Sequence, residues 1–297
     1  MHSTRQGPSR RRLIAGGAVT AAAVLLPTGT ADARSSGVAD RLRELERRHG
    51  ARLGVYAHAA DSGRTVRYRA DELFPLCSTF KTLAVAAVLR DLGGLDRRLR
   101  YTAEECADSG YAPVTGLPEN VAAGMTVEQL CDAAIRYSDN AAANLLLREL
   151  GGPEAVTRFC RSLGDGVTRL DRWEPALNSA EPGRVTDTTS PRALARTNAK
   201  LVTGRALERA DRERLTAWLL GNTTGGNRLR AGLPADWRVA EKTGTGSYGT
   251  ANDAGVAWPP GRGPVSVVVL TTHQDPSGVA DEPLIAAAAT VVAGALA

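Results

Sequence analysis

Histidine and cysteine, the residue types that most often bind zinc, are scarce in this chain of 297 residues. The sequence has no Cys-x-x-Cys pair and no histidine-rich cluster. The four histidines are scattered along the chain, at His2, His49, His58 and His273. A zinc site needs three or four such ligands brought together. The sequence therefore argues against a zinc hydrolase.

The sequence does not show whether the cysteines are free thiols or form disulfides. They are Cys77, Cys106, Cys131 and Cys160. Disulfides form in exported proteins, but four cysteines allow three complete pairings and the sequence cannot choose among them. Cys77 and Cys131 lie beside apolar helical patterns, where a buried free thiol is at least as common as a bridge. Both states stay open.

Long hydrophobic runs are also absent, because no stretch reaches the roughly 18 apolar residues that a membrane-spanning helix needs. The first residues nevertheless differ from the rest. A twin-arginine-like start at 9–14 precedes an apolar stretch at 13–26 and a small-x-small cleavage pattern at 31–33. We expect residues 1–33 to be an export signal that the mature protein lacks. The sequence thus predicts a secreted protein, in the extracellular space or the cell envelope.

Without this signal the formal net charge falls from +5 to +2. Acidic and basic residues are interspersed, which is typical of a solvated surface. The weak positive charge gives no electrostatic reason to expect binding to nucleic acid or to a membrane surface. We expect a small-molecule partner, no nucleic acid, no membrane contact in the mature form, and a monomer.

Strand patterns occur near both ends of the chain and helical patterns fill the middle. The strand patterns lie at 53–59 and 65–70, which form a hairpin, and at 237–243, 254–258 and 265–272. The helical patterns lie at 38–49, 78–92, 126–137, 140–150, 153–163, 190–203, 211–220 and 279–296.

This arrangement predicts an α/β fold of the α+β type. An antiparallel sheet built from both chain termini would be flanked by helices and would carry an inserted all-helical domain. We expect residues 34–75 and 221–297 to form the sheet subdomain and residues 76–220 to form the helical one. The cleft between them is the expected place for a binding site.

Lysine is scarcer still, with only Lys81, Lys200 and Lys242 against 34 arginines. A buried lysine can lose its proton and an arginine cannot, so each remaining lysine is a candidate for proton chemistry. Lys81 follows Ser78 by three residues, and in a helix the two side chains share one face. Free N–H groups at a helix N-terminus favour an oxyanion, and an amine with a depressed pKa can take the serine proton. The alternative is an N-cap serine and an exposed lysine.

Two further polar groups are candidates for the same site. Residues 138–140 (Ser-Asp-Asn) stand between two helical patterns, where these residue types are also the preferred N-caps. Residues 242–245 (Lys-Thr-Gly-Thr) end an apolar strand pattern. A cation beside a hydroxyl, with a glycine that allows close approach, suits recognition of a carboxylate. The alternative is a strand that runs into a glycine turn.

The order and spacing of the three groups resemble those of class A β-lactamases and penicillin-binding proteins. Two of the three lysines fall within the signature, and the likeness covers nearly the whole mature sequence. A fourth segment, 172–187, resembles the Ω-loop of class A β-lactamases and carries a glutamate, Glu174, that the transpeptidases lack. The resemblance also implies an Arg172–Asp187 ion pair at the loop neck and a cis bond before Pro175.

Class A β-lactamases hydrolyse the amide bond of penicillins and cephalosporins through an acyl-serine intermediate, which gives antibiotic resistance. The resemblance implies that Ser78 is the nucleophile and that Ser138 passes a proton to the departing nitrogen. Either Lys81, or Glu174 through a water, accepts the Ser78 proton. Glu174 and Asn178 then position the water that releases the product, and no metal or organic cofactor is needed.

The same resemblance implies a set of substrate-binding residues. They are Tyr111, Asn140, Arg228, Lys242, Thr243, Gly244 and Thr245. The backbone N–H groups of Ser78 and Thr245 would form the oxyanion hole. Ala251 stands where some members carry a carboxylate-binding arginine, so we expect Arg228 to reach that site instead. Gly246 stands where carbapenem-hydrolysing members have a cysteine that pairs with the one before the nucleophile, so that disulfide cannot form.

Two other functions stay open. A D-Ala-D-Ala carboxypeptidase or transpeptidase would share Ser78, Lys81 and Lys242 without the role of Glu174. A penicillin-sensing domain would be acylated once and would signal through a partner, usually from a membrane anchor, which this sequence lacks. The ranking of penicillins, cephalosporins and carbapenems does not follow from the sequence, because small pocket changes shift it.

Overall fold

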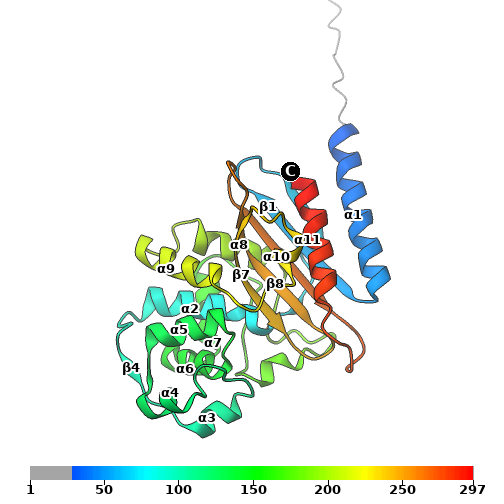
Figure 1. Ribbon diagram of the computed structural model, residues 1–297. Helices are drawn as coiled ribbons and strands as arrows, with labels where there is room; N and C mark the ends of the chain where they lie inside the picture. Colours follow the sequence, from blue (N-terminus) through cyan, green and yellow to red (C-terminus); the bar gives the residue numbers. More distant parts are fainter. Residues whose placement is uncertain (1–28, 297) are drawn as a thin grey trace, which may run out of the picture.

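The computed structural model describes residues 29–296 (Figure 1). The predicted twin-arginine motif at 9–14 and apolar stretch at 13–26 lie outside the described residues. The first described helix, α1 (Gly29–His49), begins earlier than the helical pattern at 38–49 and ends where that pattern ends. Gly50 follows with a φ of 60°, a conformation that glycine adopts readily and that commonly ends a helix.

A five-stranded antiparallel sheet in the order β2-β1-β9-β8-β7 forms the centre of the upper part of Figure 1. Its strands are β1 (Arg52–Ala59), β2 (Thr65–Tyr68), β7 (Arg238–Thr245), β8 (Ala251–Trp258) and β9 (Val265–Thr272). β1 pairs with β9 along its whole length, from Arg52 opposite Thr272 to Ala59 opposite Val265. The prediction of a sheet built from both ends of the chain is confirmed. β7 is an edge strand, which leaves one of its sides open to the pocket described below.

Helices cover both faces of this sheet (Figure 1). α1 and α11 (Glu282–Leu296) lie side by side on one face, and α8 (Pro191–Val202) lies on the other. Successive residues of β9 therefore enter different cores, Val267 on the α11 side and Val268 on the α8 side. Burial on both faces explains why β9 contains four consecutive apolar residues, at 267–270, rather than an alternating pattern.

Most of the remaining helices pack together below the sheet in Figure 1. They are α2 (Phe80–Asp91), α3 (Ala103–Asp108), α4 (Pro118–Ala123), α5 (Val127–Arg136), α6 (Asn140–Leu150), α7 (Glu154–Ser162) and α9 (Arg209–Leu220), which also contacts β7. The short α10 (Leu229–Gly232) packs instead against α11 on the sheet. The helical patterns of this region are confirmed, and the helix predicted from Ser78 begins as a 3-10 turn, Cys77–Thr79. α3, α4 and α10 are too short to show a helical period in the sequence.

Two short strand pairs brace the helical part. β4 (Arg98–Leu99) pairs with β5 (Met125–Thr126), and β3 (Phe74–Pro75) pairs with β6 (Thr188–Thr189). The second pair joins the segment before Ser78 to the end of the 172–187 loop, and the Leu76 N–H donates to the Asp187 carbonyl at 2.8 Å. The segment before Ser78 and the end of the loop, about a hundred positions apart in the sequence, are thereby held next to each other.

All four cysteines are buried free thiols, which answers the question that the sequence leaves open. Gly246, which stands where carbapenem-hydrolysing members have the second cysteine, lies beside Cys77. A Cβ atom added at Gly246 would come within 2.7 Å of the Cys77 Sγ. Because glycine carries no sulfur, Cys77 stays unpaired.

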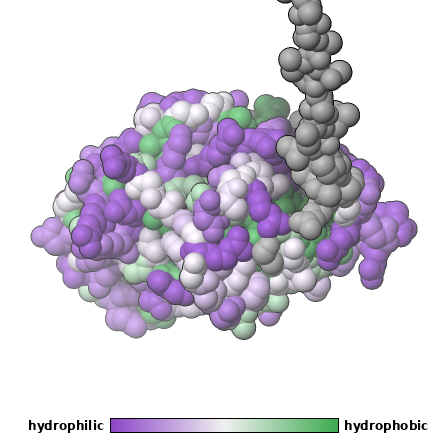
Figure 2. Space-filling model, turned by 90° about the horizontal axis from the view of Figure 1, so that it is seen from above, coloured by the Kyte–Doolittle hydropathy of each residue, from purple (hydrophilic) through white to green (hydrophobic). Residues whose placement is uncertain are grey.

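No helix among residues 29–296 is long and apolar enough to cross a bilayer. The face of the molecule seen in Figure 2 is mostly hydrophilic, and its hydrophobic residues form small separate patches. Single exposed apolar residues of this kind are ordinary in folded proteins.

Candidate active site

Ser78 lies in the 3-10 turn that leads into α2, at a pocket beside the edge strand β7. Cys77 before it has a φ of 44°, a left-handed conformation that is uncommon for any residue other than glycine. The hydroxyl of Ser78 caps no helix and donates to Oε1 of Glu174 at 3.3 Å. The N-cap interpretation of this serine is therefore wrong.

Lys81 lies one turn further along the same helix and is fully buried. Its Nζ donates to the Ser138 carbonyl at 2.7 Å and to Oδ1 of Asn140 at 2.6 Å, and it pairs with Oε1 of Glu174 at 3.1 Å. Burial disfavours the charged amine and lowers the pKa of Lys81 below its ordinary value, although Glu174 acts in the opposite direction. An amine in this state can accept and release a proton, and the exposed-lysine alternative is excluded.

Residues 138–140 join α5 to α6 and divide between two roles. Asp139 is the N-cap of α6, because it accepts the Ala142 N–H at 2.8 Å, and its other oxygen accepts the Thr115 N–H. Ser138, which has a φ of 57°, and Asn140 contribute to the lining of the pocket instead. The capping interpretation holds for Asp139 alone.

The Ser138 hydroxyl lies between two buried amines. Lys242 Nζ donates to it at 3.0 Å and Lys81 Nζ at 3.4 Å. Lys242 is fully buried on β7, and burial together with the charges of Lys81 and Arg228 lowers its pKa well below the ordinary value. A hydroxyl held in this way can pass a proton from an amine to an atom in the pocket.

The 172–187 loop brings a carboxylate to the pocket. Arg172 Nε pairs with Oδ2 of Asp187 at 2.6 Å, and the bond before Pro175 is cis, so both features implied by the resemblance are confirmed. Glu174 is buried, and Asn178 Nδ2 donates to its Oε2. The carboxylate thus faces Ser78 and Lys81 with one oxygen and Asn178 with the other.

Asn144, on α6, is a residue of this site that no sequence motif contains. Its Oδ1 accepts the Glu174 N–H at 3.0 Å and its Nδ2 donates to the Glu174 carbonyl at 2.9 Å. The side chain therefore fixes the backbone that carries Glu174. Its position four residues after Asn140, on the same helix face, is the signal that could have identified it.

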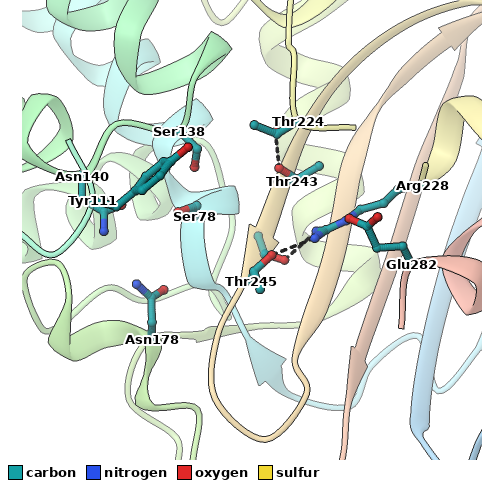
Figure 3. A pocket seen from close by; sticks show the side chains of 11 residues that line it. Ser78, Tyr111, Ser138, Asn140, Asn178, Thr224, Arg228, Thr243, Thr245 and Glu282 are labelled. Atoms are coloured by element: carbon teal, nitrogen blue, oxygen red, sulfur yellow. Dashed lines mark hydrogen bonds and ion pairs between the residues drawn. The ribbon is translucent and has the colours of Figure 1, made fainter. Parts of the chain in front are cut away.

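These groups enclose a cavity of about 390 Å³, a size that suits a small molecule. In Figure 3, Ser78, Ser138 and Asn140 lie across the cavity from Thr243 and Thr245 of β7. Gly244 between the two threonines packs closely, because a Cβ atom there would lie 3.0 Å from the Leu76 carbonyl. Within residues 29–296, no cluster of three or more His, Cys, Asp or Glu side chains could hold a metal ion.

A model of the β-lactamase enzyme family matches residues 37–296. The chain belongs to this family. A β-lactamase of Streptomyces lavendulae is 63% identical over 304 residues and covers 100% of both chains. A β-lactamase of Mycobacterium tuberculosis is 50% identical over 279 residues, which is 91% of this chain and 90% of the relative.

Solved structures of β-lactamases have the same fold. The enzyme from Streptomyces albus G is 62% identical with a TM-score of 0.86, over 87% of this chain and 98% of that chain. A mutant of the class A β-lactamase of the last common ancestor of Gram-negative bacteria is 52% identical with a TM-score of 0.83, over the same shares. The resemblance to class A is confirmed. The protein is a serine β-lactamase that hydrolyses β-lactams and so gives antibiotic resistance, and the transpeptidase and sensor alternatives are not favoured.

In this β-lactamase Arg228 reaches the end of β7 from the segment before α10. Its Nη2 donates to Oγ1 of Thr245 and its Nη1 to the Gly244 carbonyl, both at 2.8 Å (Figure 3). Ala251, where some members carry an arginine, is fully buried and lies opposite Thr245 on β8. A guanidinium therefore stands beside the threonines of the cavity although the β8 position lacks one.

Three further lining residues complete the cavity. Tyr111, which the resemblance implied, is half exposed at 52% and stands across the cavity from β7 (Figure 3). Glu282, at the start of α11, pairs with Nε of Arg228 at 3.0 Å, and Thr224, in the loop after α9, contacts Thr243. No sequence pattern indicates Glu282 or Thr224, because only the folded sheet brings their segments to β7.

Proposed function

We propose that Ser78 is the nucleophile of this β-lactamase and that Lys81 and Glu174 handle its proton. The Ser78 oxygen would attack the lactam carbonyl carbon, the ring C–N bond would break, and an ester on Ser78 would form. One observation carries the proposal: Ser78 Oγ and Lys81 Nζ converge on the same atom, Oε1 of Glu174, at 3.3 and 3.1 Å. Both candidate bases, the Lys81 amine and the Glu174 carboxylate, therefore lie close to the Ser78 hydroxyl. The proton would go to the amine or, directly or through a water, to the carboxylate.

The departing ring nitrogen needs a proton as the C–N bond breaks, and we assign its delivery to Ser138. The Ser138 hydroxyl accepts from Lys81 and Lys242, so it can give its own proton to the nitrogen and regain one from an amine. The depressed pKa of Lys242 makes that return transfer easier.

Substrate recognition in this proposal divides between the two walls of the cavity. The β-lactam carboxylate would bind Lys242, Thr243, Thr245 and Arg228 on the β7 side. The acylamide side chain would lie against Asn140 and Tyr111 on the other. The backbone N–H groups of Ser78 and Thr245 would stabilise the oxyanion, an interaction worth roughly 3 kcal/mol per donor.

Release of the product requires a water that attacks the acyl ester, and we assign its activation to Glu174. The carboxylate would take a proton from the water while Asn178 holds the water in place. The Asn178–Glu174 hydrogen bond and the Asn144 clamp on the Glu174 backbone support this role, because they fix the carboxylate beside Ser78.

Pre-steady-state hydrolysis of a chromogenic cephalosporin tests the scheme as a whole. We expect a burst of about one equivalent at most, followed by sustained turnover, because Glu174 is placed to hydrolyse the ester. Mass spectrometry during turnover should detect the acyl adduct on the peptide that contains Ser78. One equivalent of acylation with no further turnover would contradict the deacylation role.

Arg228→Ala should raise the KM for penicillins about tenfold to a hundredfold with a smaller change in kcat. The variant loses a charge-assisted hydrogen bond to the carboxylate, which is worth about 1.5–3 kcal/mol. It also leaves the negative charge of Glu282 without its arginine beside the incoming anion. Arg209→Ala, which removes an exposed arginine paired with Glu213 on α9, is the control. An unchanged KM in Arg228→Ala would refute the assignment.

We further propose that residues 34–75 with 221–297 and residues 76–220 act as two subdomains of a monomer, and that residues 1–33 export it through a twin-arginine pathway. The position of the cavity between β7 and the helices supports the first division. Replacement of Arg10, Arg11 and Arg12 by lysine should abolish export, measured as β-lactamase activity in the culture medium. Intact mass of exported wild-type protein should show a chain that begins after Ala33, and export of the triple variant at the wild-type level would contradict the proposal.

A further inference from the structure

Thr243, one of the proposed carboxylate-binding residues, is the end of a chain of hydrogen bonds that runs into the core. Its Oγ1 lies 2.5 Å from Oγ1 of Thr224 (Figure 3). Thr224 is in turn bound to Asn222, and Asn222 to Glu241 of β7. No step of the proposed mechanism uses Thr224, Asn222 or Glu241.

The direction of every bond in this chain follows from its buried end. Asn222 must present Nδ2 to Oε1 of Glu241, at 3.3 Å, because a carboxylate oxygen accepts. Oδ1 of Asn222 then accepts from Thr224 twice, from its N–H at 3.2 Å and from its hydroxyl at 2.9 Å. A threonine hydroxyl has one proton, and Thr224 donates it to Asn222. Thr243 is therefore the donor in the bond between the two threonines.

Glu241 can fix the direction of these hydrogen bonds because its own carboxyl group is fixed by its neighbours. It is fully buried and interacts with the carboxyl group of Asp253, on the neighbouring strand β8. Oε2 of Glu241 and Oδ1 of Asp253 are buried and have no hydrogen-bond donor among the described residues, and we infer that one proton shared by the two carboxyl groups satisfies both. Burial and the Asp253 carboxyl raise the pKa of Glu241 well above its ordinary value, and burial raises that of Asp253. Arg230 lies 3.1 Å from Oε1 of Glu241, the oxygen that accepts from Asn222.

The loop that carries Thr224 is packed directly onto this carboxyl group. A Cβ atom at Gly225 would lie 1.6 Å from Oε1 of Glu241, so only glycine allows the loop to approach so closely. The close packing explains how a half-buried threonine at the cavity is tied to a fully buried acid pair.

We propose that Thr224 is a positioning residue that holds the Thr243 proton away from the substrate carboxylate, and so weakens the binding of that carboxylate. This proposal rests on the role proposed above for Thr243. In the free enzyme the Thr243 hydroxyl offers the cavity oxygen lone pairs rather than a proton. The Thr243 hydroxyl can donate to a carboxylate in two ways. It can break its hydrogen bond to Thr224. Alternatively, the Thr224 hydroxyl can turn and donate to Thr243, and Asn222 Oδ1 then keeps only the Thr224 N–H. One hydrogen bond is exchanged in both cases, which offsets part of the new charge-assisted bond.

Thr224→Val tests this inference because valine keeps the shape of threonine and removes the acceptor. The KM for a penicillin should fall about threefold to tenfold, and kcat should stay within about twofold, because the exchange of one neutral hydrogen bond is avoided. Thr224→Ser restores the hydroxyl and should restore the wild-type KM. The methyl ester of the same penicillin has no carboxylate, and its KM should be the same in Thr224→Val and wild type. KM does not depend on the fraction of folded enzyme, so partial misfolding does not disturb the comparison.

Thr243→Val separates the two proposals. It should raise the KM for the free acid, and Thr224→Val should have no further effect in that background. If Thr243→Val leaves the KM unchanged, the carboxylate role of Thr243 fails and the inference fails with it. If Thr243→Val raises the KM but Thr224→Val does not lower it, the inference about Thr224 alone is wrong. An equal fall of the KM for the acid and for the ester would also overturn the inference, because it would indicate a change in the shape of the cavity.

Discussion

Glu174→Ala should stop this β-lactamase at the acyl-enzyme. Removal of a general base typically lowers a rate about 10²- to 10⁴-fold, and the loss should fall on hydrolysis of the ester. Acylation should survive, because Glu174 is the strongest of the groups that raise the pKa of Lys81. Without the carboxylate the Lys81 pKa falls further, so the amine is more often neutral and able to accept the Ser78 proton. Mass spectrometry of the variant after mixing with a penicillin should show one stable adduct per chain.

Glu181→Ala is the matched control for this variant. Glu181 belongs to the same loop but is partly exposed and binds Ser179 and Arg184 rather than the cavity residues. It should turn over at about the wild-type rate. Turnover of Glu174→Ala at the wild-type rate would show that another group activates the water. If Glu174→Ala is not acylated at all, Glu174 rather than Lys81 is the base that accepts the Ser78 proton.

Ser78→Ala should abolish acylation altogether. The nucleophile has no substitute in the cavity, because Ser138 Oγ is held between two amines and lies on the leaving-group side of the proposed mechanism. Loss of a nucleophile lowers kcat by orders of magnitude, on the order of 10⁴-fold or more. The fold should be kept, since the Ser78 hydroxyl makes a hydrogen bond only to Glu174 among the described contacts.

The absence of a mass shift after prolonged incubation with a penicillin is the measurement for Ser78→Ala. Ser62→Ala, in the exposed β1–β2 turn, provides the control and should be acylated and turn over normally. An adduct on Ser78→Ala at the wild-type rate would mean that a different side chain is acylated, and peptide mapping would identify it.

The residues that perform chemistry could be predicted from the sequence because their spacing is constrained. Ser78 and Lys81 must share a helix face, and Lys242 and Thr243 are adjacent in one strand, so each pair leaves a local signature. The central sheet could be predicted as well, because β9 is rich in β-branched residues, which favour a strand over a helix.

The residues that support the chemistry could not be predicted in the same way. Thr224, Asn222 and Glu282 lie in a loop and at a helix start, where the residue types are ordinary. Glu241 stands in a strand between Ala240 and Lys242, and its significance depends on Asp253, which comes from another strand. Such contacts arise between segments that only the folded sheet aligns, and no local period records them.

The sheet that joins the two chain ends also dictates an order of events during synthesis. β9 lies between β1 and β8, yet it begins at Val265 whereas β1 begins at Arg52. A growing chain can pack its helices while β1 still has one edge without a partner, and pairings so distant in sequence form late. A ribosome that stops before Val265 would therefore release a chain with a bare strand edge, open to pairing with other molecules. β9, the last strand of the sheet to be synthesised, is thus the one that protects the first strand from aggregation.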